Sequence, residues 1–295
     1  MTPPGFDTWS RIALSTVEEA LRRWVPGDAP GGLGEAMRYA VLDGGKRLRP
    51  LLVLAACQAV SGQSLAALRA AVAVELIHAY SLVHDDMPCM DNDVLRRGKP
   101  TVHVQYGQAL AMLAGDAMQA LAFDVLTAGD DVPVPAQARL CALLARAAGH
   151  AGMAGGQAID LASVGKPLAE EVLRDMHRRK TGALLKASVM MGVACGEASP
   201  TAERALEAYG EAVGLAFQVV DDILDVTQSS VVLGKTAGKD QQHNKPTYVS
   251  LLGLDGARAY AQELRARAQA ALSDSGLGAC AMLQTLADRV VQRES

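Results

Sequence analysis

Two groups of acidic residues stand at the ends of strongly apolar segments of this chain. The acids of the first group are Asp85, Asp86 and Asp91, and those of the second group are Asp221, Asp222 and Asp225. An apolar helix belongs inside a bundle, where ionised side chains are costly unless they are paired or bind a metal. Oxygen ligands alone favour Mg²⁺, which usually reaches its substrate through phosphate groups. The pattern therefore predicts a magnesium site for a phosphate-bearing substrate.

The spacing within each group sets how its acids can meet. In DDILD, Asp221 and Asp225 are one helical turn apart and share a face. In DDMPCMD, Asp85 and Asp91 are six residues apart, which is about 240° on an ideal helix. Pro88 disrupts a helix, so we expect Asp91 to fold back toward Asp85. For either group alone, a solvated acidic helix end is the simpler explanation, and the presence of two such groups disfavours it.

Short groups of cations lie where a polyanion would need them: GGKRLRP (44–50), RRGKP (96–100), RRKTG (178–182), and Lys235, Lys239 and Lys245 in one polar stretch. Lys46 and Arg49 precede a helix expected to open at Pro50, whose free N–H groups favour phosphate. Arginine can bind phosphate through two hydrogen bonds, and Arg96 and Arg97 closely follow the first acidic group. The chain thus predicts one basic pocket for a metal-free anion and one acidic pocket that binds an anion through Mg²⁺.

The composition excludes several classes of protein. The formal charge of the 295 residues is −4, which argues against a surface that tracks nucleic acid. The five cysteines are odd in number and lack any CxxC spacing, so neither a disulfide framework nor a zinc ribbon is supported. We find no signal-peptide pattern and no uninterrupted apolar stretch of membrane-spanning length. A cytoplasmic protein without stable membrane insertion is the expectation.

Apolar residues recur at helical spacing in almost every segment, and Ala and Leu greatly outnumber the aromatic residues. We predict an all-α fold with a single domain over residues 1–295. The expected helices span 8–24, 50–60, 65–86, 102–126, 135–149, 168–178, 183–195, 199–225 and 256–272. The polar stretch from Thr227 to Pro246 is too long for a simple connection, and we expect a loop that closes over the site and excludes water.

The combined motifs extend through nearly the whole chain. They are GGKRLRP, ELIHAYSLVHDDMPCMDNDVLRRGKPTVH, LAGDAMQ, GMAGGQAIDL, KTGALL, FQVVDDILD and LGKTAGKD. Together they resemble the short-chain trans-isoprenyl diphosphate synthases, most of all the bacterial farnesyl diphosphate synthase type. The first acidic motif has the DDxxxxD form of those bacterial members. The resemblance implies a bundle of long helices around a deep central cavity, usually paired as a homodimer.

The same resemblance implies a role for individual residues. Asp85, Asp86, Asp91, Asp221, Asp222 and Asp225 would hold three Mg²⁺. Arg96, Lys180 and Lys235 would bind the allylic diphosphate, and Lys46, Arg49, His78 and Arg97 would bind isopentenyl diphosphate. Thr181 and Gln218 would stabilise a carbocation through their dipoles. Lys245 fits less well, because Asn244 and Pro246 flank it where many relatives have other residues.

The implied reaction is ionisation of an allylic diphosphate, attack by the isopentenyl double bond, and loss of a proton to the released diphosphate. Tyr80 lies five residues before Asp85, about 7.5 Å back along a helix, and Ser81 lies four before it. In the family the growing chain runs back along this helix. A bulky Tyr80 would stop growth near C15, which predicts (2E,6E)-farnesyl diphosphate made by two condensations.

Other functions stay open beside this one. A geranylgeranyl diphosphate synthase would share the chemistry and extend the product to C20. His84 and Asp85 match the dyad of HD-type phosphohydrolases, but the accompanying histidine pattern is lacking. A terpene cyclase usually has a second metal motif of different composition, and a non-catalytic subunit would be expected to have lost one acidic group.

Overall fold

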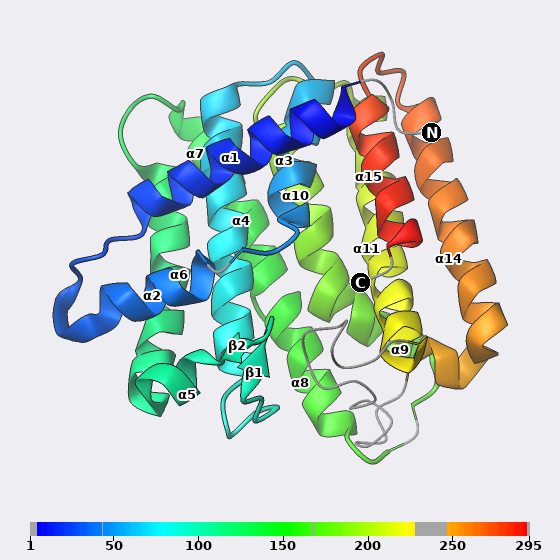
Figure 1. Cartoon of the computed structure of the whole chain (residues 1–295). Coiled ribbons are helices and arrows are strands. Elements are labelled where there is room, and N and C mark those ends of the chain that lie inside the picture. Colours follow the sequence, from blue (N-terminus) through cyan, green and yellow to red (C-terminus); the bar gives the residue numbers. More distant parts are fainter. Residues whose placement is uncertain (1–4, 43, 167, 228–246, 294–295) are drawn as a thin grey trace.

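A computed structural model describes residues 5–42, 44–166, 168–227 and 247–293. The all-α prediction is confirmed for this part of the chain (Figure 1). Its α-helices are α1 Phe6–Trp24, α2 Leu33–Val41, α3 Leu48–Ala59, α4 Ser64–Asp85, α5 Val102–Tyr106, α6 Gln108–Thr127, α7 Val134–Ala148, α8 Met153–Ser163, α9 Glu170–His177, α10 Ala183–Ala194, α11 Pro200–Thr227, α14 Tyr248–Asp274 and α15 Ala281–Gln292. The remaining elements are the 3₁₀ turn η1 Pro30–Gly32, the π-helix η2 Arg178–Gly182, and the strands β1 Leu95–Arg96 and β2 Lys99–Pro100.

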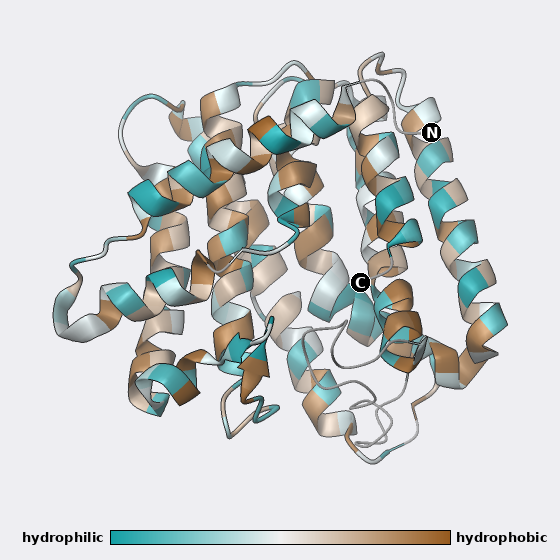
Figure 2. Ribbon diagram, viewed as in Figure 1, coloured by the Kyte–Doolittle hydropathy of each residue, from teal (hydrophilic) through white to brown (hydrophobic). Residues whose placement is uncertain are grey.

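The core forms around helices that are apolar on nearly every side. In α4, all residues from Ala70 to Ile77 are buried, so this helix needs neighbours around its whole circumference. One apolar cluster joins α4 to α2, α6 and α7, and a second joins α3 to α10, α11, α14 and α15. Helix α1 crosses over α3 and α4 on the outside (Figure 1). The outer helices α1 and α14 alternate hydrophilic and hydrophobic residues (Figure 2).

Several predicted boundaries are wrong for identifiable reasons. The expected helix 102–126 breaks at Gly107, whose φ of 85° and ψ of 157° end α5 and begin α6. Helix α3 begins at Leu48, so Arg49 lies in its first turn rather than before it. Helix α14 begins at Tyr248, eight residues earlier than expected. Helices α2, α8 and α15 were not expected, because glycines or a short apolar pattern obscure them.

Helices α4 and α6 are long and apolar enough to cross a membrane by length and composition. In α4, 72% of the most apolar window is buried inside the protein, as expected of a core helix. In α6 only 39% is buried, and Met112 and Leu113 are exposed. One apolar face of α6 is therefore left uncovered by the described chain.

Candidate active site at the ends of α4 and α11

The first acidic group lies where α4 stops. The helix ends at Asp85, and the chain then turns back so that the Asp91 N–H donates to the Asp85 carbonyl (2.9 Å). The Asp93 N–H donates in the same way to the Asp86 carbonyl (3.1 Å). The predicted return of Asp91 toward the helix end is confirmed, and it places Asp91 and Asp86 near enough to Asp85 for their charges to act on it.

Burial gives these carboxyl groups unusual electrostatics. Burial, followed by the negative charge of Asp91, raises the pKa of Asp85 to about 6, although nearby Lys180 opposes the shift. Asp86 is 3% exposed, and burial raises its pKa even though Arg96 stabilises the charged form. Arg96 Nε donates to both oxygens of this carboxylate (2.9 Å each), and Arg96 Nη2 donates to Asp86 Oδ1 (2.6 Å). The end of α4 is therefore a concentration of negative charge with one tightly bound cation.

A π-helix carries the predicted residues Lys180 and Thr181. Lys180 Nζ lies 2.6 Å from Asp160 Oδ2 of α8, and Lys180 is near enough to Asp85 to lower its pKa. A Cβ on Gly156 would lie 2.2 Å from the Lys180 backbone nitrogen, so only glycine lets α8 approach η2 this closely. Single π-turns occur frequently at functional sites, because they displace side chains from the regular helical register.

The second acidic group lies near the end of α11 and has two kinds of environment. Asp221 and Asp225 are half-buried, and Asp221 Oδ1 is 2.7 Å from a guanidinium nitrogen of Arg293. Asp222 is 2% exposed, with Oδ1 accepting from Gln218 Nε2 (2.8 Å) and Oδ2 accepting from the Tyr248 N–H (2.8 Å). Asp222 thus ties α11 to the start of α14.

A hydrogen-bonded chain connects the π-helix to these acids. The Thr181 hydroxyl donates to Gln218 Oε1 (2.9 Å), and the Gln218 amide donates in turn to Asp222. Tyr248, which completes the chain through its backbone N–H, packs its ring 5.4 Å from that of His177. Burial lowers the pKa of His177 to about 4, so its imidazole is neutral near pH 7. The structure therefore places the two residues predicted to face the reacting carbons in direct contact.

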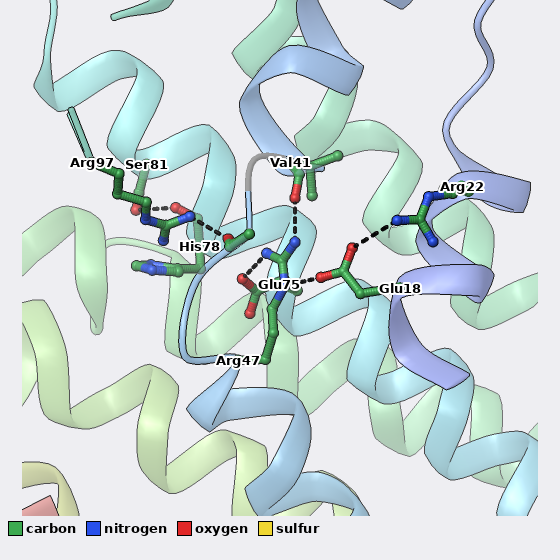
Figure 3. Close-up of polar contacts among 9 residues, drawn as sticks. Glu18, Arg22, Val41, Arg47, Glu75, His78, Ser81 and Arg97 are labelled. Atoms are coloured by element: carbon green, nitrogen blue, oxygen red, sulfur yellow. Dashed lines mark hydrogen bonds and ion pairs between the residues drawn. The ribbon is translucent and has the colours of Figure 1, made fainter. Parts of the chain in front are cut away.

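The predicted cations of the second anion pocket also gather. Figure 3 shows the Arg97 guanidinium beside the His78 ring, and Arg97 donates to the Gly44 carbonyl. Burial and the positive charges of Arg49 and Arg97 hold the pKa of His78 well below its ordinary value. Burial and nearby Arg293 lower the pKa of Lys46. Such crowding of cations is expected of a site that binds a polyanion.

Sequence reasoning missed three residues of this region: Asp160, Tyr248 and Arg293. Arg293 lies in the last described residues, stacks 3.9 Å from the Phe217 ring centroid, and donates to the Phe217 carbonyl (2.5 Å). Its side chain is 10% exposed. No local pattern marks it, because its partners lie on α11. Asp160 stands in the motif GMAGGQAIDL, whose acidic residue could have been paired with a cation.

Tyr80 and Ser81 lie on α4, on the approach to Asp85. The Tyr80 ring packs edge-on against His84 at 5.7 Å and is partly buried in the core. Burial, followed by the negative charge of nearby Asp85, raises the pKa of Tyr80. The Ser81 hydroxyl donates to the His78 carbonyl (2.9 Å) of its own helix. Lys235 and Lys245 lie outside the described residues.

The donor set fits a hard divalent cation that shares its ligands with a substrate. Among the described residues, no three acidic, histidine or cysteine side chains converge to form a metal site alone. Mg²⁺ typically takes one or two carboxylates and completes its octahedron with phosphate oxygens and water. Asp85, with its pKa raised by burial and neighbouring acids, would gain from such a cation.

Comparison with known families supports this chemistry. A model of the polyprenyl synthetase family matches residues 31–276. Farnesyl diphosphate synthase of Escherichia coli is 49% identical over 266 residues, which cover 88% of each chain. The chloroplastic geranylgeranyl pyrophosphate synthase 9 of Arabidopsis thaliana is 46% identical over 285 residues, covering 95% of this chain and 79% of that one.

Solved structures agree in fold. An FPP/GFPP synthase from Zymomonas mobilis matches with a TM-score of 0.87 and 41% identity, covering 97% of this chain and 99% of that one. A geranyltransferase from Helicobacter pylori, complexed with magnesium and isoprenyl diphosphate, matches with a TM-score of 0.85 and 34% identity, covering 98% of this chain and 97% of that one.

Proposed function

This chain belongs to the polyprenyl synthetase family, and we propose that it is a prenyltransferase that makes (2E,6E)-farnesyl diphosphate. It would condense isopentenyl diphosphate first with dimethylallyl diphosphate and then with geranyl diphosphate. The arrangement that carries the proposal is the pair of acidic groups on α4 and α11, each beside its own set of cations. The membership itself supports prenyl transfer and dependence on a divalent metal.

The side chains divide the work of the proposed reaction. Lys180 and Arg96 bind the allylic diphosphate, with Lys235, outside the described residues, as a further ligand. The six aspartates would hold three Mg²⁺, which would supply positive charge to the departing diphosphate. The hydroxyl of Thr181 and the amide of Gln218, joined at 2.9 Å, present dipoles to the cation without a strong nucleophile.

Isopentenyl diphosphate is held by the second set of cations and polar residues, Lys46, Arg49, His78 and Arg97. Its double bond attacks the allylic cation, and the released diphosphate accepts the proton.

Tyr80 supports a C15 rather than a C20 product. Its ring lies about one and a half turns before Asp85 and packs edge-on against the His84 ring. A large, fixed side chain at this depth would block further growth. The named relatives include both farnesyl and geranylgeranyl synthases, so the C20 product is the second candidate.

Product analysis tests the proposal. The purified protein is incubated with isopentenyl and dimethylallyl diphosphates, with Mg²⁺ or with EDTA, and the products are identified by mass spectrometry. We expect a C15 diphosphate that requires Mg²⁺. Tyr80→Ala should shift the product to C20 or longer, whereas Tyr80→Phe, which keeps the ring, should retain C15. A C20 product from the unaltered protein would overturn the role of Tyr80 and keep the reaction class.

We further propose a homodimer formed through α6. The exposed Met112 and Leu113, and the low burial of the apolar window of α6, support a covering partner. Leu113→Lys should convert a dimer into a monomer by light scattering coupled to size-exclusion chromatography. A single-chain mass for the unaltered protein would contradict this. The cytoplasm is the proposed compartment, in keeping with the five free thiols.

A further inference from the structure

The turn that carries Lys46 adopts a backbone conformation that needs support. Gly44, Gly45 and Arg47 have φ values of 81°, 124° and 47°. Glycine adopts such angles readily, but Arg47 has a Cβ that makes the left-handed region unfavourable. The conformation of this turn therefore depends on what the Arg47 side chain contacts.

Each of the three guanidinium nitrogens of Arg47 donates a hydrogen bond to a different segment of the chain. Nε donates to Glu18 of α1 (2.7 Å), Nη1 donates to Glu75 of α4 (2.6 Å), and Nη2 donates to the Val41 carbonyl at the end of α2 (2.6 Å). Figure 3 shows these partners around the guanidinium group. Arg47 is 4% exposed and Glu75 is 3% exposed. We call Arg47, Glu75 and Glu18 the buried charge triad.

Stability alone is a weak reason for such a triad. Desolvation offsets most of the attraction in a buried ion pair, and apolar residues of similar size are often at least as stabilising. Glu75 is moreover a charged residue among the apolar residues of α4, and its Oε2 is buried without a hydrogen-bond partner. The specific geometry that the triad enforces is the more informative property.

That geometry concerns the second anion pocket. Arg47 stands between Lys46 and Arg49 in sequence, and Glu75 lies one turn before His78 on the same face of α4. The Arg47–Glu75 pair thus fixes the segment that carries two of the predicted isopentenyl diphosphate ligands against the helix that carries a third. Arg47 is also close enough to His78 to be one of the cations that lower its pKa.

We propose that Arg47 and Glu75, with Glu18 as the outer partner, are positioning residues for the isopentenyl diphosphate site. The triad sets where Lys46, Arg49 and His78 stand relative to one another and does not itself touch the substrate. This inference rests on the proposed function. It predicts that loss of the triad impairs use of isopentenyl diphosphate and spares use of the allylic diphosphate.

Steady-state kinetics with each substrate varied in turn test this. In Arg47→Met, we expect KM for isopentenyl diphosphate to rise at least about tenfold, KM for the allylic substrate to change less than about twofold, and kcat at saturation to be largely kept. The double variant Arg47→Met/Glu75→Met leaves no unpaired charge between α3 and α4 and should restore the melting temperature. Its raised KM for isopentenyl diphosphate should persist.

Arg69 provides a matched control. It is a buried arginine of α4 that binds the Ala128 carbonyl and Asp131, away from the predicted cations. Arg69→Met should lower the melting temperature and leave both KM values unchanged. A folded double variant with an unaltered KM for isopentenyl diphosphate would overturn the positioning role, as would equal rises in both KM values. Absence of condensation by the unaltered protein would instead contradict the proposed function, so the two failures are distinguishable.

Discussion

The two acidic groups share a sequence pattern but are stabilised by different parts of the chain. At the end of α4, Asp86 is held by Arg96, which is ten residues further along. At the end of α11, Asp221 is paired with Arg293 near the C-terminus, and Asp222 accepts from the first N–H of α14. The first group is held mainly by its own loop, with Lys180 of η2 as the distant neighbour of Asp85, whereas the second depends on three helices being packed together.

This difference indicates how the two halves of the site should respond to change. A local unit keeps its geometry as long as its own loop is intact. A group assembled by tertiary contacts is sensitive to the start of α14 and to the C-terminus. The two groups should therefore be equally needed for turnover and unequally sensitive to changes in their surroundings.

The largest effect is expected from removing one charge in either group. Asp85→Asn and Asp221→Asn should each lower kcat by about a thousandfold or more, equivalent to about 4 kcal/mol of transition-state stabilisation. Asp85 ends α4, Asp221 lies six residues before the end of α11, and each is near predicted diphosphate ligands. Single-turnover measurements at saturating Mg²⁺ check this, with circular dichroism to confirm folding. Near-normal turnover of either variant would contradict a role for that acidic group in the active site.

Removing the cation that pairs with each acidic group should lower the free energy of unfolding by different amounts. Arg96→Met leaves Asp86, 3% exposed, without its cation, and should lower the free energy of unfolding by about 3 kcal/mol. Arg293→Met leaves Asp221, whose side chain is 40% exposed, able to be solvated, and should cost about 1 kcal/mol or less. Urea denaturation measures both. Equal losses would contradict the difference between a buried and a half-buried pair.

Acidification should lower the stability of the fold near the second acidic group, because His177 packs against Tyr248. Its pKa is held near 4 in the folded state, below the ordinary 6.5, because burial disfavours the charged ring. The unfolded chain therefore binds more protons as pH falls from about 6.5 to 4, and this contribution to stability is lost over that range. The loss should be roughly 2 to 3 kcal/mol. In His177→Gln, which cannot titrate, the denaturation midpoint should depend less on pH between 6.5 and 4, and an unchanged dependence would contradict this assignment.

A small effect is expected at the start of α14. Thr247 caps this helix by accepting from the Ser250 N–H (3.1 Å), while the Thr247 N–H donates to the Ser250 hydroxyl (3.0 Å). Thr247→Ala should cost about 1 kcal/mol and should loosen the Tyr248 contact with Asp222. Hydrogen exchange at α14 should then rise while exchange at residues 86–93 stays constant. A parallel rise at both places would show that the groups are not independently supported.

The sequence predicted the features that depend on neighbouring residues and did not predict those that depend on contacts between distant segments. The run of apolar residues in α4, the helix-breaking Pro88 and the nearby arginines are local signals, and they predicted the return of Asp91 and the cluster of cations. The break at Gly107 and the short helices α2, α8 and α15 depend on single glycines and on tertiary contacts that no period reveals. Arg293 and the Arg47–Glu75 pair could not be predicted, because their partners are brought together only by folding.

Metal binding measured directly tests the central claim, that two differently supported acidic groups serve one diphosphate. Isothermal titration calorimetry would follow Mg²⁺ binding in the presence of an unreactive allylic thiolodiphosphate, for the unaltered protein, Asp85→Asn and Asp221→Asn. We predict that each variant loses at least one Mg²⁺ from the stoichiometry and binds the analogue more weakly. Full stoichiometry and affinity in either variant would contradict the shared site.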